Sequence, residues 1–299
     1  MFCNKNIKTK IIDYKKELLK EVKDRTNRKQ LKNKKNGMKV FIIDFNHNDK
    51  SNAFVKFEKD VDTVILNSKK GDEVIITINT PGGAVTSYAN ASTQIKRLKD
   101  SGLYVYGYID EIAASGGYMM ASVCHKIVAQ PLAFVGSIGV VSQVFIFEEL
   151  MKKVGVNGKV YTAGKNKRSV TPFKEPTDEE EETFKEKLKE IHEAFKSHVL
   201  ENRKIDTNKF MEGDFYLAKD VLEDNFVDKI SDSKTDIFNK LKEGYDIFYI
   251  DTKIKSKSKG ILGLIGLDLE NITEGIVSSV ANKINRIIYW FYFNYSYTL

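Results

Sequence analysis

Apolar runs alternate with helix-periodic segments from about Val40 to Ile230, and this pattern predicts an α/β domain. The short runs are rich in β-branched residues, as is typical of strands that are buried on both faces. The segments between them place apolar residues three and four positions apart, which favours helices packed on a sheet. The predicted strands are 40–45, 74–78, 103–109, 127–129 and 159–162; the predicted helices are 52–67, 87–101, 118–123, 145–154, 178–202 and 217–222. Because strands and helices alternate, we expect βαβ units around a parallel sheet.

Both ends of the chain depart from this pattern. Residues 1–38 show only a thin apolar stripe between charged residues and predict one or two helices, while residues 287–293 are mostly aromatic. An aromatic segment of that length is too short to span a bilayer but suits a membrane interface or a subunit contact. We therefore predict three parts: a basic helical arm (1–38), a core (39–232) and a C-terminal extension (233–299) that contacts a membrane or another subunit.

Positive charge is concentrated at the N-terminal end. The 299 residues include 48 Lys/Arg and 41 Asp/Glu, and residues 1–39 alone hold 14 Lys/Arg against 4 Asp/Glu. Such an arm favours an anionic membrane surface as a partner. It lacks the interleaving of basic and aromatic residues that is typical of nucleic-acid surfaces, so no specific nucleic-acid partner is expected. No apolar run reaches 18 residues, and no secretory leader is apparent. We expect membrane association on an unassigned side, with a cytoplasmic location as the alternative.

Cysteine and histidine usage argues against two further classes of protein. Cys3 and Cys124 are far apart and form no disulfide framework. The four histidines lack metal-ligand spacing with acidic residues or cysteines. We therefore expect neither a metal nor another cofactor.

Three turns of small residues follow predicted strands, and two of them carry candidate chemistry directly. In Pro81-Gly82-Gly83-Ala84, the backbone N–H groups of Gly83 and Ala84 are candidates to bind a developing oxyanion. The alternative is a simple tight turn. In Ala113-Ala114-Ser115-Gly116-Gly117-Tyr118, a serine stands at a helix start, where it serves either as a nucleophile or as the helix cap.

The third turn, Gly136-Ser137-Ile138-Gly139-Val140, precedes the basic loop Ala163-Gly164-Lys165-Asn166-Lys167-Arg168. Taken in this order, the four motifs resemble the signal peptide peptidase family of SppA-like serine proteases, in its SohB-type branch. The resemblance extends from about Val40 to Ile230. It implies a crotonase-like, Clp-protease-like α/β fold.

The resemblance also implies roles for individual residues in a Ser-Lys dyad. Ser115 matches the nucleophile, Lys167 matches the base, and Lys165 is the competing base. Ser137 matches a serine that orients the lysine. Gly83 matches the oxyanion hole, to which Ala84 and Gly116 are added.

The chemistry agrees with these roles, because a serine hydroxyl needs an adjacent base. A lysine serves as that base only in its neutral form, which burial favours. A dyad with His125 is the alternative, although His125 is more typical of a structural histidine entering a strand.

The family resemblance further implies a ring-like homo-oligomer in which the serine and the lysine come from neighbouring subunits. It implies extended, apolar peptide substrates such as signal-peptide remnants, bound partly by strand addition. Members usually carry an N-terminal membrane anchor, and the basic arm resembles the segment after it.

Two hypotheses of other classes remain alongside the peptidase. One is a crotonase-type acyl-CoA enzyme, which needs acidic residues beside the oxyanion hole. The other is a non-catalytic, membrane-associated scaffold that uses the arm and the aromatic tail.

Overall fold

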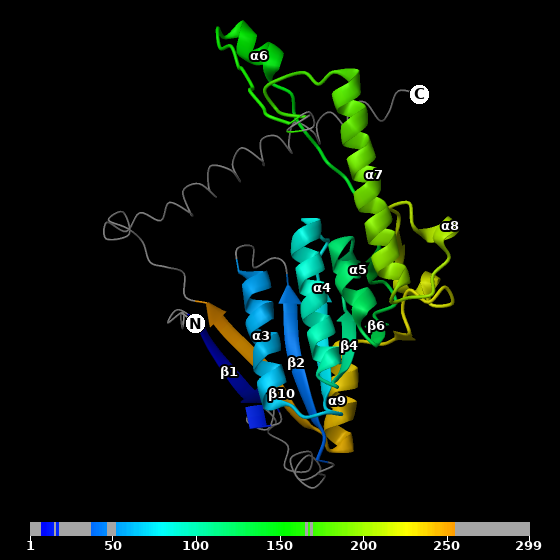
Figure 1. Cartoon of the computed structure of the whole chain (residues 1–299). Coiled ribbons are helices and arrows are strands. Elements are labelled where there is room, and N and C mark those ends of the chain that lie inside the picture. The colour runs from blue at the N-terminus through cyan, green and yellow to red at the C-terminus, as the bar shows by residue number, and fades with distance from the viewer. Residues whose placement is uncertain are drawn as a thin grey trace, which may run out of the picture. The chain divides into compact units, whose positions relative to one another are not determined.

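A seven-stranded sheet organises the computed structural model, which describes residues 7–14, 16–17, 37–46, 52–164, 167 and 170–254. Its strand order is β1-β10-β2-β3-β4-β6-β9 (Figure 1). The strands are β1 (Ile7–Asp13), β2 (Lys39–Asn46), β3 (Glu73–Asn79), β4 (Tyr104–Ile109), β6 (Lys126–Ala129), β9 (Lys229–Ile230) and β10 (Asp246–Ile254). From β10 to β9, each neighbouring pair is parallel. The predicted α/β fold class is confirmed.

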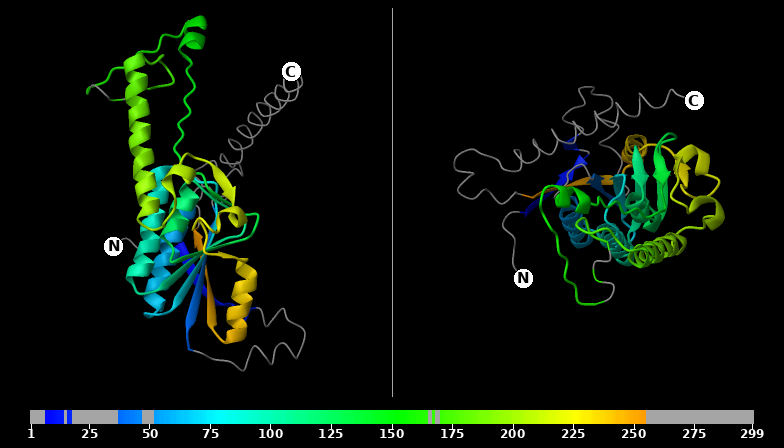
Figure 2. Two further views of the ribbon diagram at one scale, coloured as in Figure 1. Left: turned by 90° about the vertical axis from the view of Figure 1, so that its right-hand side faces the viewer. Right: turned by 90° about the horizontal axis from the view of Figure 1, so that it is seen from above.

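Helices cover both faces of this sheet (Figure 2). Helices α3 (Ala53–Asn67), α4 (Val85–Asp100) and α5 (Gly116–Val123) pack on one face, and α9 (Ser233–Glu243) on the other. Successive residues of β2 alternate between the two cores, as strand geometry requires: Phe41 and Ile43 face the first, Val40 and Ile42 the second. Burial on both faces explains the continuous apolar runs.

A second, three-stranded sheet is formed by β5 (Ile112–Ala114), β7 (Phe134–Gly136) and β8 (Phe215–Leu217). Strand β5 is parallel to β7, and β8 is antiparallel to β7. The chain just after β3 bonds to β5, since the N–H of Thr80 donates to the Ile112 carbonyl at 2.9 Å. The N–H of Ala114 donates to the Thr80 carbonyl at 3.1 Å. These bonds bring the turns after β3 and after β5 together.

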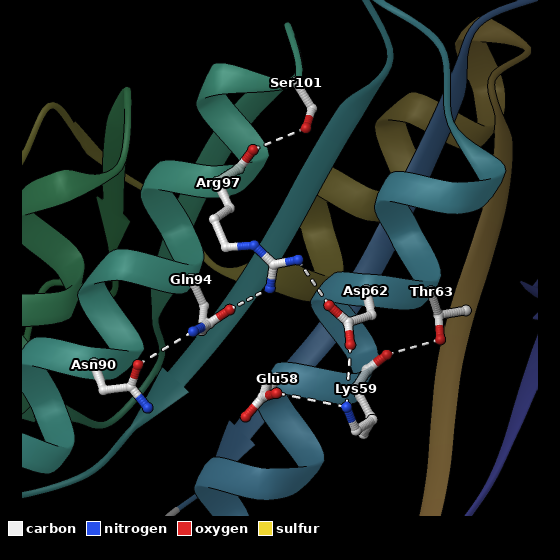
Figure 3. A network of polar contacts seen from close by, with 8 residues as sticks. All are labelled: Glu58, Lys59, Asp62, Thr63, Asn90, Gln94, Arg97 and Ser101. Atoms are coloured by element: carbon white, nitrogen blue, oxygen red, sulfur yellow. Dashed lines mark hydrogen bonds and ion pairs between the residues drawn. The ribbon is translucent and has the colours of Figure 1, made fainter. Parts of the chain in front are cut away.

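Polar contacts join α3 to α4 on the outside of the first layer (Figure 3). Arg97 donates to Asp62 at 2.8 Å and to Gln94, and Lys59 also donates to Asp62. Partial burial acts to raise the pKa of Asp62, but the hydrogen bonds from Arg97 and Lys59 outweigh it and lower that pKa. The two helices are thus held in register above the sheet.

Residues 140–164, 167 and 170–177 belong to an excursion that we call the projection, which extends away from the sheets (Figures 1 and 2). It contains the short helix α6 (Glu148–Lys153) and leads into α7 (Asp178–Leu200). Thr177 and Glu180 form a capping box that fixes where α7 begins. Beyond α7 the chain forms α8 (Thr207–Phe210) and a 3₁₀ turn, Ala218–Val221.

The structure corrects two predicted elements. Ile7–Asp13 form strand β1 rather than a helix. This strand lies next to β10, which pairs with β2, so both flanking parts of the chain contribute to the core sheet. Residues 159–162 form no strand, because no strand within the described ranges lies beside them to pair with. Residues 1–6, 15 and 18–36 of the basic arm and residues 255–299 lie outside the described residues.

Candidate active site

The turn that carries Ser115 joins β5 to α5 in an unusual backbone conformation. Ser115 has φ 51° and ψ −119°, which few non-glycine residues adopt. Its N–H donates to the Gly136 carbonyl at 2.8 Å, and its carbonyl accepts from the N–H of Met119 at 3.0 Å. The side chain makes no capping hydrogen bond to α5. The structure therefore does not support the helix-cap interpretation of this serine.

Close packing explains why glycines surround this serine. A Cβ atom on Gly116 would lie 2.4 Å from Cγ of the buried Tyr88, and one on Gly82 would lie 2.7 Å from Cβ of Ser115. Neither position has room for a side chain. Tyr88 in turn shares a hydrogen bond with Thr80, whose hydroxyl accepts from the N–H of Gly82 at 3.2 Å. The Pro-Gly-Gly turn is thus fixed directly against the Ser115 turn.

The predicted oxyanion residues lie at this junction. Gly83 and Ala84 directly precede α4, and Gly116 begins α5, so all three N–H groups stand at helix N-termini, where negative charge is favoured. Within the described residues, none of these three N–H groups has a hydrogen-bond acceptor. They are therefore available to an anionic oxygen.

Ser137 is the second residue of the third turn and also has a positive φ, of 53°. Its N–H donates to the Asp214 carbonyl at 2.6 Å, and its carbonyl accepts from the N–H of Gly139 at 3.0 Å. Ser115 and Ser137 line the same open cavity of about 960 Å³. The residues around it come from the three turns and from two later segments: Pro81, Gly82, Gly83, Ala84, Val85, Ser115, Ser137, Gly139, Val140, Val141, His192, Glu212 and Gly213.

The predicted bases do not join this cavity within the single chain. Lys167 is exposed in the loop between α6 and α7, where its N–H donates to the Gly164 carbonyl at 3.1 Å. It is not among the residues that line the cavity. Lys165 lies outside the described residues. The structure thus brings Ser115, Ser137 and the oxyanion candidates together but leaves Lys167 apart from them.

His125, the alternative base, has a structural role elsewhere. Its ring stacks on Tyr104, with centroids 4.6 Å apart, and its Nδ1 accepts from the N–H of Val105 at 3.0 Å. Burial, with a smaller contribution from the charge of Lys99, lowers the pKa of this imidazole. His125 does not line the cavity.

Sequence reasoning missed the two titratable side chains of the cavity, His192 and Glu212. His192 stands three residues before the buried Phe195 on the predicted apolar face of α7, and this spacing was the available signal. Among the described residues, no group of His, Cys, Asp or Glu is placed to hold a metal ion. None of the described helices is long and apolar enough to cross a membrane.

An α/β core with a strained serine between glycine turns, facing a cavity with unoccupied N–H donors, is typical of hydrolases that act on carbonyl groups. Comparison with known families agrees. Residues 97–248 match the model of peptidase family S49, and residues 3–95 match the model of its N-terminal region. The chain belongs to peptidase family S49.

Individual relatives place the chain more narrowly, with the SohB type of this family. It is 34% identical over 248 residues to the probable protease SohB of Haemophilus influenzae, covering 83% of this chain and 69% of that protein. It is 32% identical to the probable protease SohB of Buchnera aphidicola from Acyrthosiphon pisum, covering 88% and 74%. A putative signal peptide peptidase SppA of Enterococcus faecium is 28% identical, covering 71% and 58%. These findings support the peptidase hypothesis over the acyl-CoA enzyme and the non-catalytic scaffold.

Proposed function

We propose that this peptidase is of the serine type and that Ser115 is its nucleophile. The observation that carries the proposal is the conformation of Ser115. Its backbone is strained, its side chain makes no capping hydrogen bond to α5, and the residue lines the cavity. Such strain is typical of functional sites. The neighbouring N–H groups of Gly83, Ala84 and Gly116 supply donors for an oxyanion.

The reaction follows from these groups. The hydroxyl oxygen of Ser115 attacks the carbonyl carbon of the peptide, and a neutral lysine amine takes the hydroxyl proton. The carbonyl oxygen becomes an oxyanion, which the N–H groups stabilise. When the C–N bond breaks, the lysine returns the proton to the leaving amine. Water then hydrolyses the acyl-enzyme by the same route, which frees Ser115.

Lys167 is the proposed base, with Lys165 as the competitor, and a neighbouring subunit of a homo-oligomer supplies it. Two features support this arrangement. Lys167 does not line the cavity of its own chain, and the projection that carries it exposes apolar side chains that one chain leaves uncovered. Val141, Phe145 and Tyr161 are 90%, 64% and 86% exposed. Ser137 then orients the incoming amine by hydrogen bonding.

Extended apolar peptides near a membrane are the proposed substrates, signal-peptide remnants among them. Pro81, Val85, Val140 and Val141 give part of the cavity an apolar wall. Residues 140–146 follow β7 without joining a sheet, and among the described residues they make no backbone hydrogen bond, so their backbone is available for strand addition by a peptide. The basic residues before position 40 supply attraction to anionic lipid.

Peptidase assays on a quenched apolar peptide library test the proposal with wild type, Ser115→Ala, Lys167→Ala and Lys165→Ala. Loss of the nucleophile or the base is expected to lower kcat by about 10³-fold or more, whereas Lys165→Ala retains activity. Light scattering checks that each variant assembles as wild type does. Full activity of Ser115→Ala would refute the assignment of the nucleophile.

A further inference from the structure

Two histidines of α7 bond to the backbone segments that follow the two serine turns. Nε2 of His192 lies 2.9 Å from the Ile138 carbonyl oxygen, one residue after Ser137. Nε2 of His198 lies 3.1 Å from the carbonyl oxygen of Met119, in the first turn of α5 after Ser115. A carbonyl only accepts hydrogen bonds, so each Nε2 carries a proton and donates.

The two bonds lie where the projection joins the core. The chain leaves the core after Ile138 and returns through α7, so the bond from His192 joins the outgoing and returning segments. His198 joins the same helix to the helix of the nucleophile. Phe195 and Val199, on the same face of α7, are 2% and 0% exposed and attach it to the core.

The two carbonyl groups that accept these hydrogen bonds lie in buried surroundings. Ile138 is fully buried, and the Met119 carbonyl also accepts from the hydroxyl groups of Ser92 and Ser122, at 3.1 and 2.9 Å. His192 also lines the cavity that contains Ser115 and Ser137. The first half of α7, by contrast, has no buried residue. The histidines therefore lie between the two serine turns and the mostly exposed first half of α7.

We propose that His192 and His198 are positioning residues, which hold the Ser137 turn, the nucleophile helix and the base of the projection in one fixed geometry. This inference rests on the proposed function for its catalytic consequence. Neither imidazole is assigned contact with the reacting atoms.

Amide hydrogen exchange tests the positioning role without reference to activity. His192→Leu keeps the side-chain volume but removes the donor, and His192→Gln restores an N–H donor near the position of Nε2. In His192→Leu, exchange at the amides of Ser137 and Gly139 is expected to rise about tenfold or more, while that of β3 stays unchanged. In His192→Gln both stay near wild type. Unchanged exchange in His192→Leu overturns the inference.

Kinetics supply the second readout. We expect His192→Leu and His198→Leu each to lower kcat about 10- to 100-fold with KM within about twofold of wild type, and the glutamine variants to recover most of the loss. His125→Asn is the matched control, because it alters a structural histidine away from the cavity. If all variants lose activity only in proportion to their stability, the positioning role is wrong. If the wild-type protein has no peptidase activity, the proposed function is refuted. Hydrogen exchange in His192→Leu still tests the positioning role, because that readout does not depend on activity.

Discussion

At the scale of single residues, backbone conformation separates Ser115 from an ordinary helix cap. A cap residue typically has β-region angles and a side chain that accepts from the helix, as Thr177 does at α7. Ser115 has neither feature. Gly116 beside it is required because a Cβ would lie 2.4 Å from the ring of Tyr88. These two residues are thus placed by the packing of two turns rather than by the needs of the helix.

The lowered pKa of His125 predicts a dependence of stability on pH. The unfolded chain binds a proton at His125 more readily than the folded chain, so this histidine stabilises the fold above its unfolded pKa of about 6.5. The stabilisation is lost as pH falls through the lower, folded pKa. His125→Asn keeps an acceptor for the N–H of Val105 but does not titrate there. We expect the free energy of unfolding of the variant to fall less than that of wild type between about pH 7.5 and pH 5.

Urea denaturation at several pH values measures this difference. Subtracting the two curves removes the titration of the other histidines, which both proteins share. A difference that stays constant with pH contradicts the prediction.

At the scale of elements, one arginine fixes the C-terminal end of α7. Arg203 follows the helix, and its side chain is only 7% exposed. The guanidinium donates to both oxygens of Asp228, at 2.9 and 3.0 Å, and to the carbonyl of Asn225. Asp228 also accepts from the N–H of Ile127 in β6. Arg203 thus joins the long helix to the edge of the large sheet.

Arg203→Lys is predicted to destabilise the protein by about 2 kcal/mol, because lysine cannot reproduce the planar, bidentate pairing that the buried Arg203 guanidinium makes with Asp228. Equilibrium unfolding in urea measures the change. Arg97→Lys is the matched control: the Arg97 side chain is 43% exposed, and an ion pair at the surface contributes about 0.5 kcal/mol. Equal losses in the two variants would contradict the role given to burial.

At the scale of the whole molecule, the projection is hard to explain in one isolated chain. Helix α6 has no buried residue, and Leu150 and Val154 are 60% and 69% exposed. Exposed apolar surface of this kind marks an interaction site. A second copy of the chain that covers the projection would also receive its Lys167. The proposed assembly and the proposed base therefore depend on the same segment.

Mixing two inactive variants tests this dependence. If the dyad forms between subunits, Ser115→Ala and Lys167→Ala chains unfolded and reassembled together at equal amounts should recover about one quarter of wild-type activity. One quarter is expected because half of the chains keep the serine and half of their neighbours keep the lysine. Cleavage of the quenched apolar peptides measures the recovery. Each variant refolded alone is the control, and no recovery in well-formed mixed oligomers excludes a shared dyad.

Much of the fold was predictable because its signals are local. The apolar runs of β2 and β3 and the helical spacing within α3 and α4 can each be recognised within a short stretch of sequence. This is because side-chain direction repeats every few residues in a strand or a helix. The glycine turns are local as well. Two such turns made Ser115 and Gly83 candidate site residues, and the family resemblance of the ordered motifs added Ser137.

Long-range packing decided the remainder. Ile7–Asp13 lack a strong strand signal and become β1 only because β10, more than 230 residues later, lies beside them. His192 and Glu212 enter the cavity because α7 and the segment after it fold back onto the turns. Local patterns are enough to indicate which residues are candidates for the chemistry of a peptidase. Tertiary structure alone decided which of them meet, since the separation of Lys167 from Ser115 depends on how the projection leaves the core and not on any local pattern.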